Sequence, residues 1–273
     1  IDDDGVFVWS QSISRDGVAE DQETMNVSFF SDAARTSQLG SATGLQITAS
    51  EQIPTLIGTG FTRTGGQAIQ VGSHSGLPVQ LANPGSIRTV SLTVRHDPTA
   101  LLLDASNPVS LDSTLEEAGW SLTASHADSS TNQLTVSLRG TSDLPVDPVT
   151  NQATLLQLKA SVNSDATTGS TSTLAISGQV DADNTLIGST STQLVGLLGD
   201  SDGDGKHSVS DAISTLRHIV GLENDLAAFP GIAPQRVLDV NEDGSVAVSD
   251  AIEILRKIVG LSDDQRLNSP TLA

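Results

Sequence analysis

The sequence predicts a mainly β chain with a small α domain at its C-terminal end. Up to about residue 198, short runs of alternating apolar and polar residues are separated by turn clusters, a pattern typical of an antiparallel β-sandwich. After residue 199 the apolar period changes from two to about 3.6 residues, which indicates helices. We therefore expect a β-rich extension or small unit over 1–65, a β-sandwich over 66–198 and an α domain over 199–273.

The charge of the chain excludes several classes of partner. Its 273 residues carry a formal net charge of -20 and include only three lysines. No basic face can form to neutralise phosphates, so we expect neither nucleic acid nor an anionic lipid surface as a partner. The chain has no cysteine, which leaves no disulfide framework or thiolate zinc site. No apolar run approaches the ~20 residues of a membrane span, so we expect no membrane insertion.

The N-terminal part holds candidate strands at 6–13, 25–30 and 45–50 with irregular spacing. The sequence leaves open whether they extend the sandwich or form a separate unit. In the sandwich, candidate strands at 89–94, 133–138 and 155–162 place their apolar residues on one face, as a half-buried strand does. Turn clusters at 82–86, 126–132 and 164–172 separate the strands, and a helical turn is expected at 112–119.

An internal duplication dominates the C-terminal part. Residues 200–222 and 239–261 agree at 14 of 23 positions. Each copy begins with an aspartate-rich stretch and continues as an apolar helix pattern. Ala212, Ile213, Leu216, Ile219 and Val220 share one helix face, and the second copy repeats that face. Glycine follows at 221 and 260, where each helix is expected to end.

The aspartate-rich stretches have the spacing of calcium loops. Calcium takes about six to eight oxygen ligands, and a twelve-residue loop supplies them from positions one, three, five, seven, nine and twelve, with glycine at six. The second copy has Ala247 at position nine, so water has to replace a side-chain ligand and that site is expected to be weaker. The predicted ligands of two calcium ions are Asp200, Asp202, Asp204, the Lys206 carbonyl, Ser208 and Asp211 in the first copy, and Asp239, Asn241, Asp243, the Ser245 carbonyl and Asp250 in the second.

These loops end in aspartate rather than the glutamate of an EF-hand, and the sequence shows no helix before either of them. A loop and helix duplicated in this way resembles the dockerin module of bacterial extracellular assemblies, over about residues 198–264. The resemblance implies a secreted protein of a bacterial surface or matrix. It also implies that either copy can face a partner, through Val209, Ser210, Leu216, Arg217, Val248, Ser249, Leu255 and Arg256. For Leu216 and Leu255, ordinary core packing is an equal alternative.

The preceding sandwich resembles a cohesin, the jelly-roll module that dockerins bind. Residues 66–104 have two strands, a turn and a third strand that ends in His96, Asp97 and Pro98, followed by three leucines. Residues 153–162 resemble a late core strand of that family. The resemblance implies a cohesin-like jelly-roll fold. Carbohydrate-binding and adhesin sandwiches share much of this pattern.

No catalytic residues are expected. The five histidines form no pair at metal-ligand spacing. Glu116 and Glu117 lie close to Trp120, as a glycosidase acid can, but two tryptophans and no tyrosine do not make a sugar-binding platform. We therefore expect a protein that is not an enzyme.

The favoured function is calcium-dependent assembly, in which the dockerin-like domain docks on the cohesin-like domain of another copy. Docking centred on the second and third sandwich strands would build head-to-tail extracellular filaments or a biofilm matrix. The alternative is an adhesin or carbohydrate-binding sandwich, serving cell adhesion and anchored to a separate cohesin scaffold by its dockerin. An enzyme subunit of a polysaccharide-degrading complex would need a catalytic part within residues 1–65, which is too short.

Overall fold

The computed structural model describes residues 21–30, 38–49, 53–128, 131–181, 184–222 and 226–268. The strand predicted at 6–13 lies outside these residues. The chain divides into two compact units, 1–53 and 54–273. The first unit contains β1 (Asp21–Phe30) and β2 (Gln38–Ala49), which pair antiparallel. They cover the strands predicted at 25–30 and 45–50.

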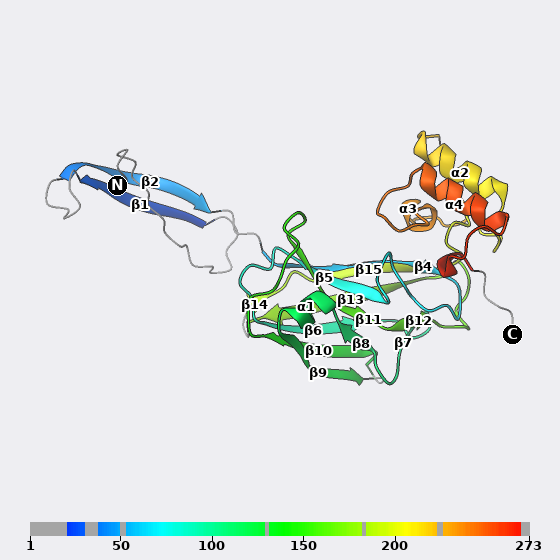
Figure 1. The fold of residues 1–273 in the computed structure, drawn as a ribbon, viewed down its shortest axis with the longest axis horizontal. Coiled ribbons are helices and arrows are strands. Elements are labelled where there is room, and N and C mark those ends of the chain that lie inside the picture. Colours follow the sequence, from blue (N-terminus) through cyan, green and yellow to red (C-terminus); the bar gives the residue numbers. More distant parts are fainter. Residues whose placement is uncertain are drawn as a thin grey trace. The chain divides into compact units, whose positions relative to one another are not determined.

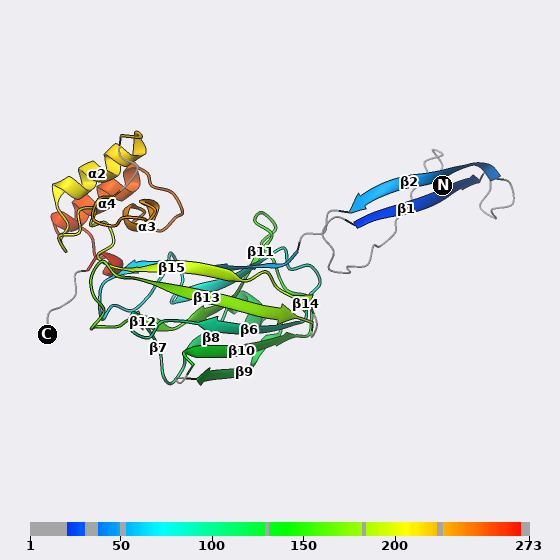
Figure 2. The same cartoon turned by 180° about the vertical axis from the view of Figure 1, so that it is seen from behind.

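The second unit contains a β-sandwich, which confirms the mainly β class (Figures 1 and 2). One sheet has the order β4 (Thr62–Arg63), β15 (Ser189–Val195), β13 (Thr171–Val180), β6 (Thr89–Arg95), β10 (Gln133–Gly140) and β9 (Trp120–Asp128), with β14 (Asn184–Thr185) beside β13. The other sheet has the order β3 (Thr55–Gly58), β5 (Leu77–Ala82), β11 (Gln152–Leu158) and β8 (Val109–Leu111). A separate pair joins β12 (Ala160–Val162) to β7 (Leu101–Leu103).

The sandwich core follows the predicted alternation. Both sheets contribute to one cluster of buried apolar side chains. In β6 and β10 every second residue is buried, so the pleat directs these residues inward and their neighbours outward. The buried residues of these two strands are Val90, Leu92, Val94, Leu134, Val136 and Leu138.

The structure corrects two predicted boundaries. The strand expected at 155–162 is divided between β11 and β12, which belong to different sheets. A bulge in β11 between Thr154 and Leu156 lets Leu155 and Leu156 both point into the core. The sandwich also begins before residue 66, because β3 and β4 already pair within its two sheets.

The C-terminal part is helical and lies beyond β15 (Figure 1). Its main helices, α2 (Val209–Ile219) and α4 (Val248–Ile258), contact each other. Both end as predicted, with Gly221 and Gly260 at φ 72°. The following leucine N–H groups, of Leu222 and Leu261, reach back to the Arg217 and Arg256 carbonyls at 2.9 and 2.8 Å. These hydrogen bonds across each helix end belong to the Schellman motif, in which glycine adopts the left-handed backbone conformation.

Shorter helices complete the unit. α1 (Ser113–Glu117) is the predicted helical turn, and the Asp112 carboxylate caps it by accepting from the Thr114 N–H. The second loop follows a short helix, α3 (Gln235–Leu238), so the expectation that no helix precedes it is wrong. A 3-10 turn covers Gln265–Leu267. Among the described helices, none has both the length and the hydropathy needed to cross a bilayer.

The helical part is joined to the sandwich by apolar packing. Leu194 of β15 belongs to one buried cluster with Leu226, Phe229, Val237 and Leu238. The Gly199 N–H donates to the Val237 carbonyl at 2.8 Å. The last sandwich strand therefore packs directly against the helical part. The domain boundary at residue 199 stays a prediction.

Candidate functional site

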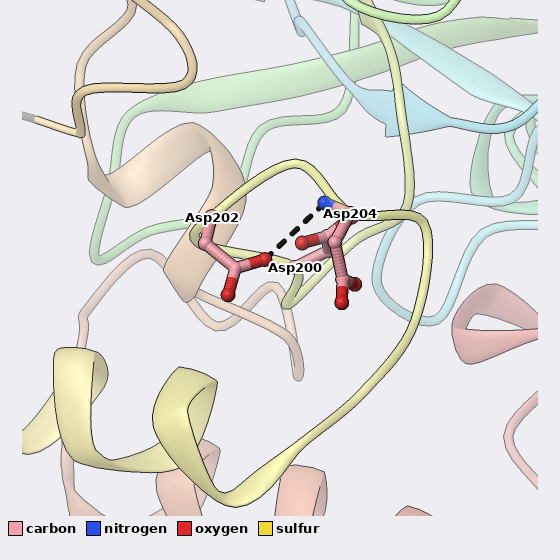
Figure 3. Close-up of side chains that lie close together, drawn as sticks. All are labelled: Asp200, Asp202 and Asp204. Atoms are coloured by element: carbon pink, nitrogen blue, oxygen red, sulfur yellow. Dashed lines mark hydrogen bonds between the residues drawn. The ribbon is translucent and has the colours of Figure 1, made fainter.

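The first aspartate-rich loop gathers three carboxylates. Oxygen atoms of Asp200, Asp202 and Asp204 all lie within 4.8 Å of one another (Figure 3). Asp200 is buried, whereas Asp202 and Asp204 are exposed. In the close-up their side chains converge, and the Asp204 N–H donates to Asp202 Oδ1 at 3.2 Å. The arrangement offers several oxygen ligands around one point, which is the donor chemistry of a hard cation.

Backbone hydrogen bonds hold this loop in shape. Asp200 accepts from the Gly203 N–H at 2.8 Å and from the Gly205 N–H at 2.7 Å. Asp211, at position twelve, is fully buried and accepts from the N–H groups of Ser201 and Ser208, both at 2.8 Å. The first and last aspartates of the loop therefore close it from both ends.

The predicted ligands at the middle of the first loop have other contacts. The Ser208 hydroxyl lies 2.9 Å from Asp211 Oδ2 and is also close to Ser210. The Lys206 N–H donates to Asp204 Oδ1 at 2.8 Å. The structure thus brings the three early aspartates together and turns Ser208 toward Asp211.

The second loop repeats this geometry. Asp239 accepts from the Gly244 N–H at 3.0 Å, and Asp250 accepts from the N–H groups of Val240 and Ala247, both at 2.9 Å. The Asn241 side-chain amide donates to Asp243 Oδ2 at 2.9 Å. The Ser245 N–H donates to Asp243 Oδ1 at 2.9 Å, as Lys206 does in the first copy.

The charged form of the first aspartate of each loop is disfavoured by its surroundings. Burial raises the pKa of Asp200 to about 6, against hydrogen bonds from the Gly205 and Gly203 amides, and the charges of Asp211 and Asp202 raise it further. Burial likewise raises the pKa of Asp239 to about 6. Low dielectric and like charge both disfavour these carboxylates, and a bound divalent cation would relieve both effects.

The eight predicted partner-facing residues all lie on the exposed surface of the helices. Leu216 and Leu255 remain 40% and 39% exposed, so the structure contradicts the core alternative for them. The same surface includes Ile213 and Ile252, each 51% exposed. We call the exposed apolar residues of α2 and α4 the apolar helix face. Its members are Val209, Ile213, Leu216, Ile219, Val248, Ile252, Leu255 and Ile258.

The apolar helix face is exposed because the helices pack through another side. In α2 the buried residues are Asp211, Ala212 and Thr215, and the equivalent residues of α4 are buried too. The core between them is small: Leu198, Ala212, Val240, Ile254 and Leu267. Of the apolar residues that the sequence predicts on one face of each helix, mainly Ala212 and its second-copy equivalent are therefore buried.

The predicted acceptor surface on the sandwich is wrong as stated. The second and third predicted strands correspond to β5 and β6, which belong to different sheets and cannot form one surface. β6, β10 and β13 instead share a sheet whose outward residues are mostly hydroxyl-bearing. We call this surface the hydroxyl face, defined by the exposed residues of the three strands: Ser91, Arg95, Thr135, Arg139, Thr171, Thr173, Ser177 and Gln179.

Sequence reasoning missed a buried ion pair between the second loop and the sandwich. Arg63 of β4 lies 2.9 Å from Glu242, at loop position four. Arg266 reaches the same carboxylate at 3.2 Å. A signal was present in the duplication, because Glu242 replaces the glycine that stands at the equivalent position, 203, of the first copy.

No family model matches this chain, and no curated protein matches it. Among solved structures, its neighbours are cohesin modules that cover about half of it. The sixth cohesin of scaffoldin B from Acetivibrio cellulolyticus, solved with a dockerin, has 16% identity and a TM-score of 0.38, covering 53% of this chain and 99% of that chain. A cohesin from a Clostridium thermocellum cohesin–dockerin complex has 12% identity and a TM-score of 0.37, with coverage of 53% and 99%. A type II cohesin domain from the Acetivibrio cellulolyticus cellulosome has 10% identity and a TM-score of 0.36, with coverage of 52% and 94%.

Proposed function

We propose that this chain is a secreted, calcium-dependent assembly protein without enzymatic activity. Its dockerin-like helical part docks on the cohesin-like sandwich of another copy, and repeated docking builds head-to-tail filaments or an extracellular matrix. The apolar helix face carries this proposal. Apolar side chains at matching positions of two helices stay exposed, and exposed apolar side chains that gather on a surface mark an interaction site.

Two calcium ions belong to this proposal. The first would be held by Asp200, Asp202, Asp204, Asp211 and the carbonyl of Lys206, and the second by the equivalent residues that begin at Asp239. Bound calcium supplies positive charge to oxygens that otherwise repel one another. The residues of each loop then hold the N-terminal ends of α2 and α4, where the apolar helix face begins.

The hydroxyl face is the acceptor that this proposal assigns to the apolar helix face. Its strands lie side by side in one sheet, and its exposed residues carry hydroxyl groups, two arginines and one glutamine but no carboxylate. A surface without carboxylates avoids part of the repulsion expected between two acidic proteins. A specific interface of this type buries about 1,600 Å².

The contact is heterologous, because helices of one copy meet a sheet of the next. Such contacts propagate into rings or open filaments unless the rotation closes them. Growth therefore needs no second kind of subunit.

Sedimentation of the purified protein tests the proposal. In millimolar calcium the wild type is expected to form species that grow with concentration, and chelator is expected to return them to monomer. The Leu216→Arg, Leu255→Arg double variant is expected to stay monomeric, because it places charge in both copies of the helix face. Glu116→Gln, at an exposed position of α1, is the control. A wild type that is monomeric at every concentration in calcium contradicts self-assembly; binding to a foreign cohesin or to a glycan array would then favour the anchored adhesin.

A further inference from the structure

The second calcium loop is attached to the sandwich by a shielded ion pair. Glu242 Oε1 lies 2.9 Å from Arg63 Nη1, and Glu242 Oε2 lies 2.9 Å from Arg63 Nη2. The exposed fraction of the Arg63 side chain is 0%, and that of Glu242 is 11%. Two parallel contacts between a guanidinium and a carboxylate fix orientation as well as distance.

Both charges have further hydrogen-bond partners. Glu242 Oε2 accepts from the Gly72 N–H at 3.0 Å and from Arg266 Nη1 at 3.2 Å. Arg63 donates to the Thr62 carbonyl at 2.8 Å and to the Gln70 carbonyl. The Arg63 Nε atom is buried without a hydrogen-bond partner, whereas both Arg63 Nη atoms and both Glu242 oxygens have partners. Removing one member of a buried pair leaves the other charge uncompensated, so each charge at this junction depends on the other.

Only one of the two loops has this attachment among the described residues. Loop position four is Gly203 in the first copy, with φ 75°, and Glu242 in the second, with φ 56°. A left-handed backbone suits glycine and is uncommon for glutamate, and such outliers persist where the surroundings hold them. Glu242 lies between Asn241 and Asp243, which are proposed ligands. The cation and the sandwich would therefore act on the same three residues.

We propose that the second loop is a calcium-dependent clamp, in which cation binding and the seating of the helical part on its own sandwich stabilise each other. This inference rests on the calcium binding proposed above. A cation held by Asn241 and Asp243 fixes the backbone on both sides of Glu242 and so aims its carboxylate at Arg63. In turn, the pair with Arg63 holds the loop ready for the cation. Coupling of this kind is reciprocal.

A simple charge effect makes the opposite prediction for one variant. If Glu242 acted only by adding negative charge near the cation, then removing the positive charge of Arg63 would tighten calcium binding. The clamp predicts that Arg63→Met weakens binding, because the loop loses its attachment. Arg63 therefore separates the two explanations.

Calorimetric titration with calcium chloride tests the clamp on the full chain. An Asp211→Ala background removes the first site, so that only the second loop is measured. In that background Glu242→Gly and Arg63→Met are each expected to weaken binding by about 5- to 150-fold, the range of coupled sites. Arg88→Met changes the same charge at a sandwich arginine whose side chain is 64% exposed, and its affinity is expected to stay within about twofold.

Calorimetric unfolding provides the second measurement if Arg63→Met does not fold. Glu242→Gly is expected to fold, because glycine favours the left-handed backbone at this position. In calcium the background protein is expected to unfold in one transition over sandwich and helical part, and Glu242→Gly in two. Unchanged affinity and a single transition for Glu242→Gly, or tighter binding by Arg63→Met, overturn the clamp alone. If the background protein binds no calcium, the proposed second site and the clamp both fail.

Discussion

His96 lies just beyond the end of β6, with its Nδ1 atom buried and without a hydrogen-bond partner. Burial lowers the pKa of His96 below its ordinary value of 6.5, although the Asn132 backbone and the charge of Asp97 act in the opposite direction. The folded state therefore favours the neutral imidazole. Its contribution to stability is complete above pH 6.5 and is lost as the pH falls through the lowered value.

We expect His96→Gln to make the stability of the sandwich less dependent on pH. Between pH 8 and 5, the free energy of unfolding of the wild type should fall more than that of the variant, because the unfolded wild type takes up a proton that the folded state resists. Urea unfolding followed by tryptophan fluorescence measures the free energy of unfolding of both proteins. If the free energies of unfolding of the two proteins change in parallel with pH, His96 titrates alike in the folded and unfolded states, which contradicts the prediction.

Gly60 lies at the junction between the sandwich and the helical part, where a single added Cβ atom would not fit. A Cβ at this position would lie 2.3 Å from the Thr192 carbonyl oxygen and 2.5 Å from Arg236 Cζ. We expect Gly60→Ala to lower the free energy of unfolding by about 1–3 kcal/mol, as overpacking does. Gly196→Ala is the matched control, because its Cβ would meet only atoms at 3.7 Å or beyond. Thermal unfolding of the pair measures the difference, and equal melting temperatures would contradict the crowding.

At the scale of elements, each loop and the helix after it form one unit. Asp211 and Asp250 lie within the first turns of α2 and α4 and also accept N–H groups from the start of their loops, at Ser201 and Val240. A cation held by the loop therefore acts on the helix N-terminus through these aspartates. Helix order and metal binding should be linked.

Chelation is expected to lower the helical circular dichroism and the protease resistance of residues 199–273. The reason is that the carboxylates of each loop repel one another when no cation neutralises them. Asp211→Ala and Asp250→Ala should each reduce the calcium stoichiometry from two to one. Identical spectra and digestion patterns with and without chelator would contradict metal-coupled folding.

At the scale of the whole molecule, assembly has to overcome a net charge of -20 on every copy. Long-range repulsion between copies is screened over about 10 Å at 0.1 M salt. The proposed contact is apolar and hydroxyl-rich apart from arginines on both surfaces. Salt screens the repulsion between those arginines as well, so it should weaken the contact little.

At saturating calcium we therefore expect larger assemblies in about 0.5 M sodium chloride than in about 0.02 M, because the shorter Debye length reduces repulsion between copies. Sedimentation at both salt concentrations, with calcium binding confirmed in each, measures the effect. Assemblies that dissolve as salt rises would indicate an interface held mainly by ion pairs.

Local patterns were enough to predict the mainly β class, the α1 turn, the inward residues of β6 and β10, and the glycine ends of α2 and α4. Period and turn chemistry act between near neighbours, so the sequence displays them directly. The duplication also located both loops, because ligand spacing within twelve residues is a local property. The calcium ions themselves stay a prediction.

Tertiary structure decided what depends on distant residues. A bulge and a change of sheet divided the strand expected at 155–162, and β3 and β4 joined the sandwich through partners more than twenty residues away. An apolar helix pattern does not say whether its face meets a core or solvent, and here packing through Ala212, Ala251 and Ile254 left Leu216 and Leu255 exposed. The pairing of Arg63 with Glu242 joins residues 179 positions apart. Only folding brings these two side chains together at a site shielded from solvent, so no local pattern in the sequence predicts the ion pair.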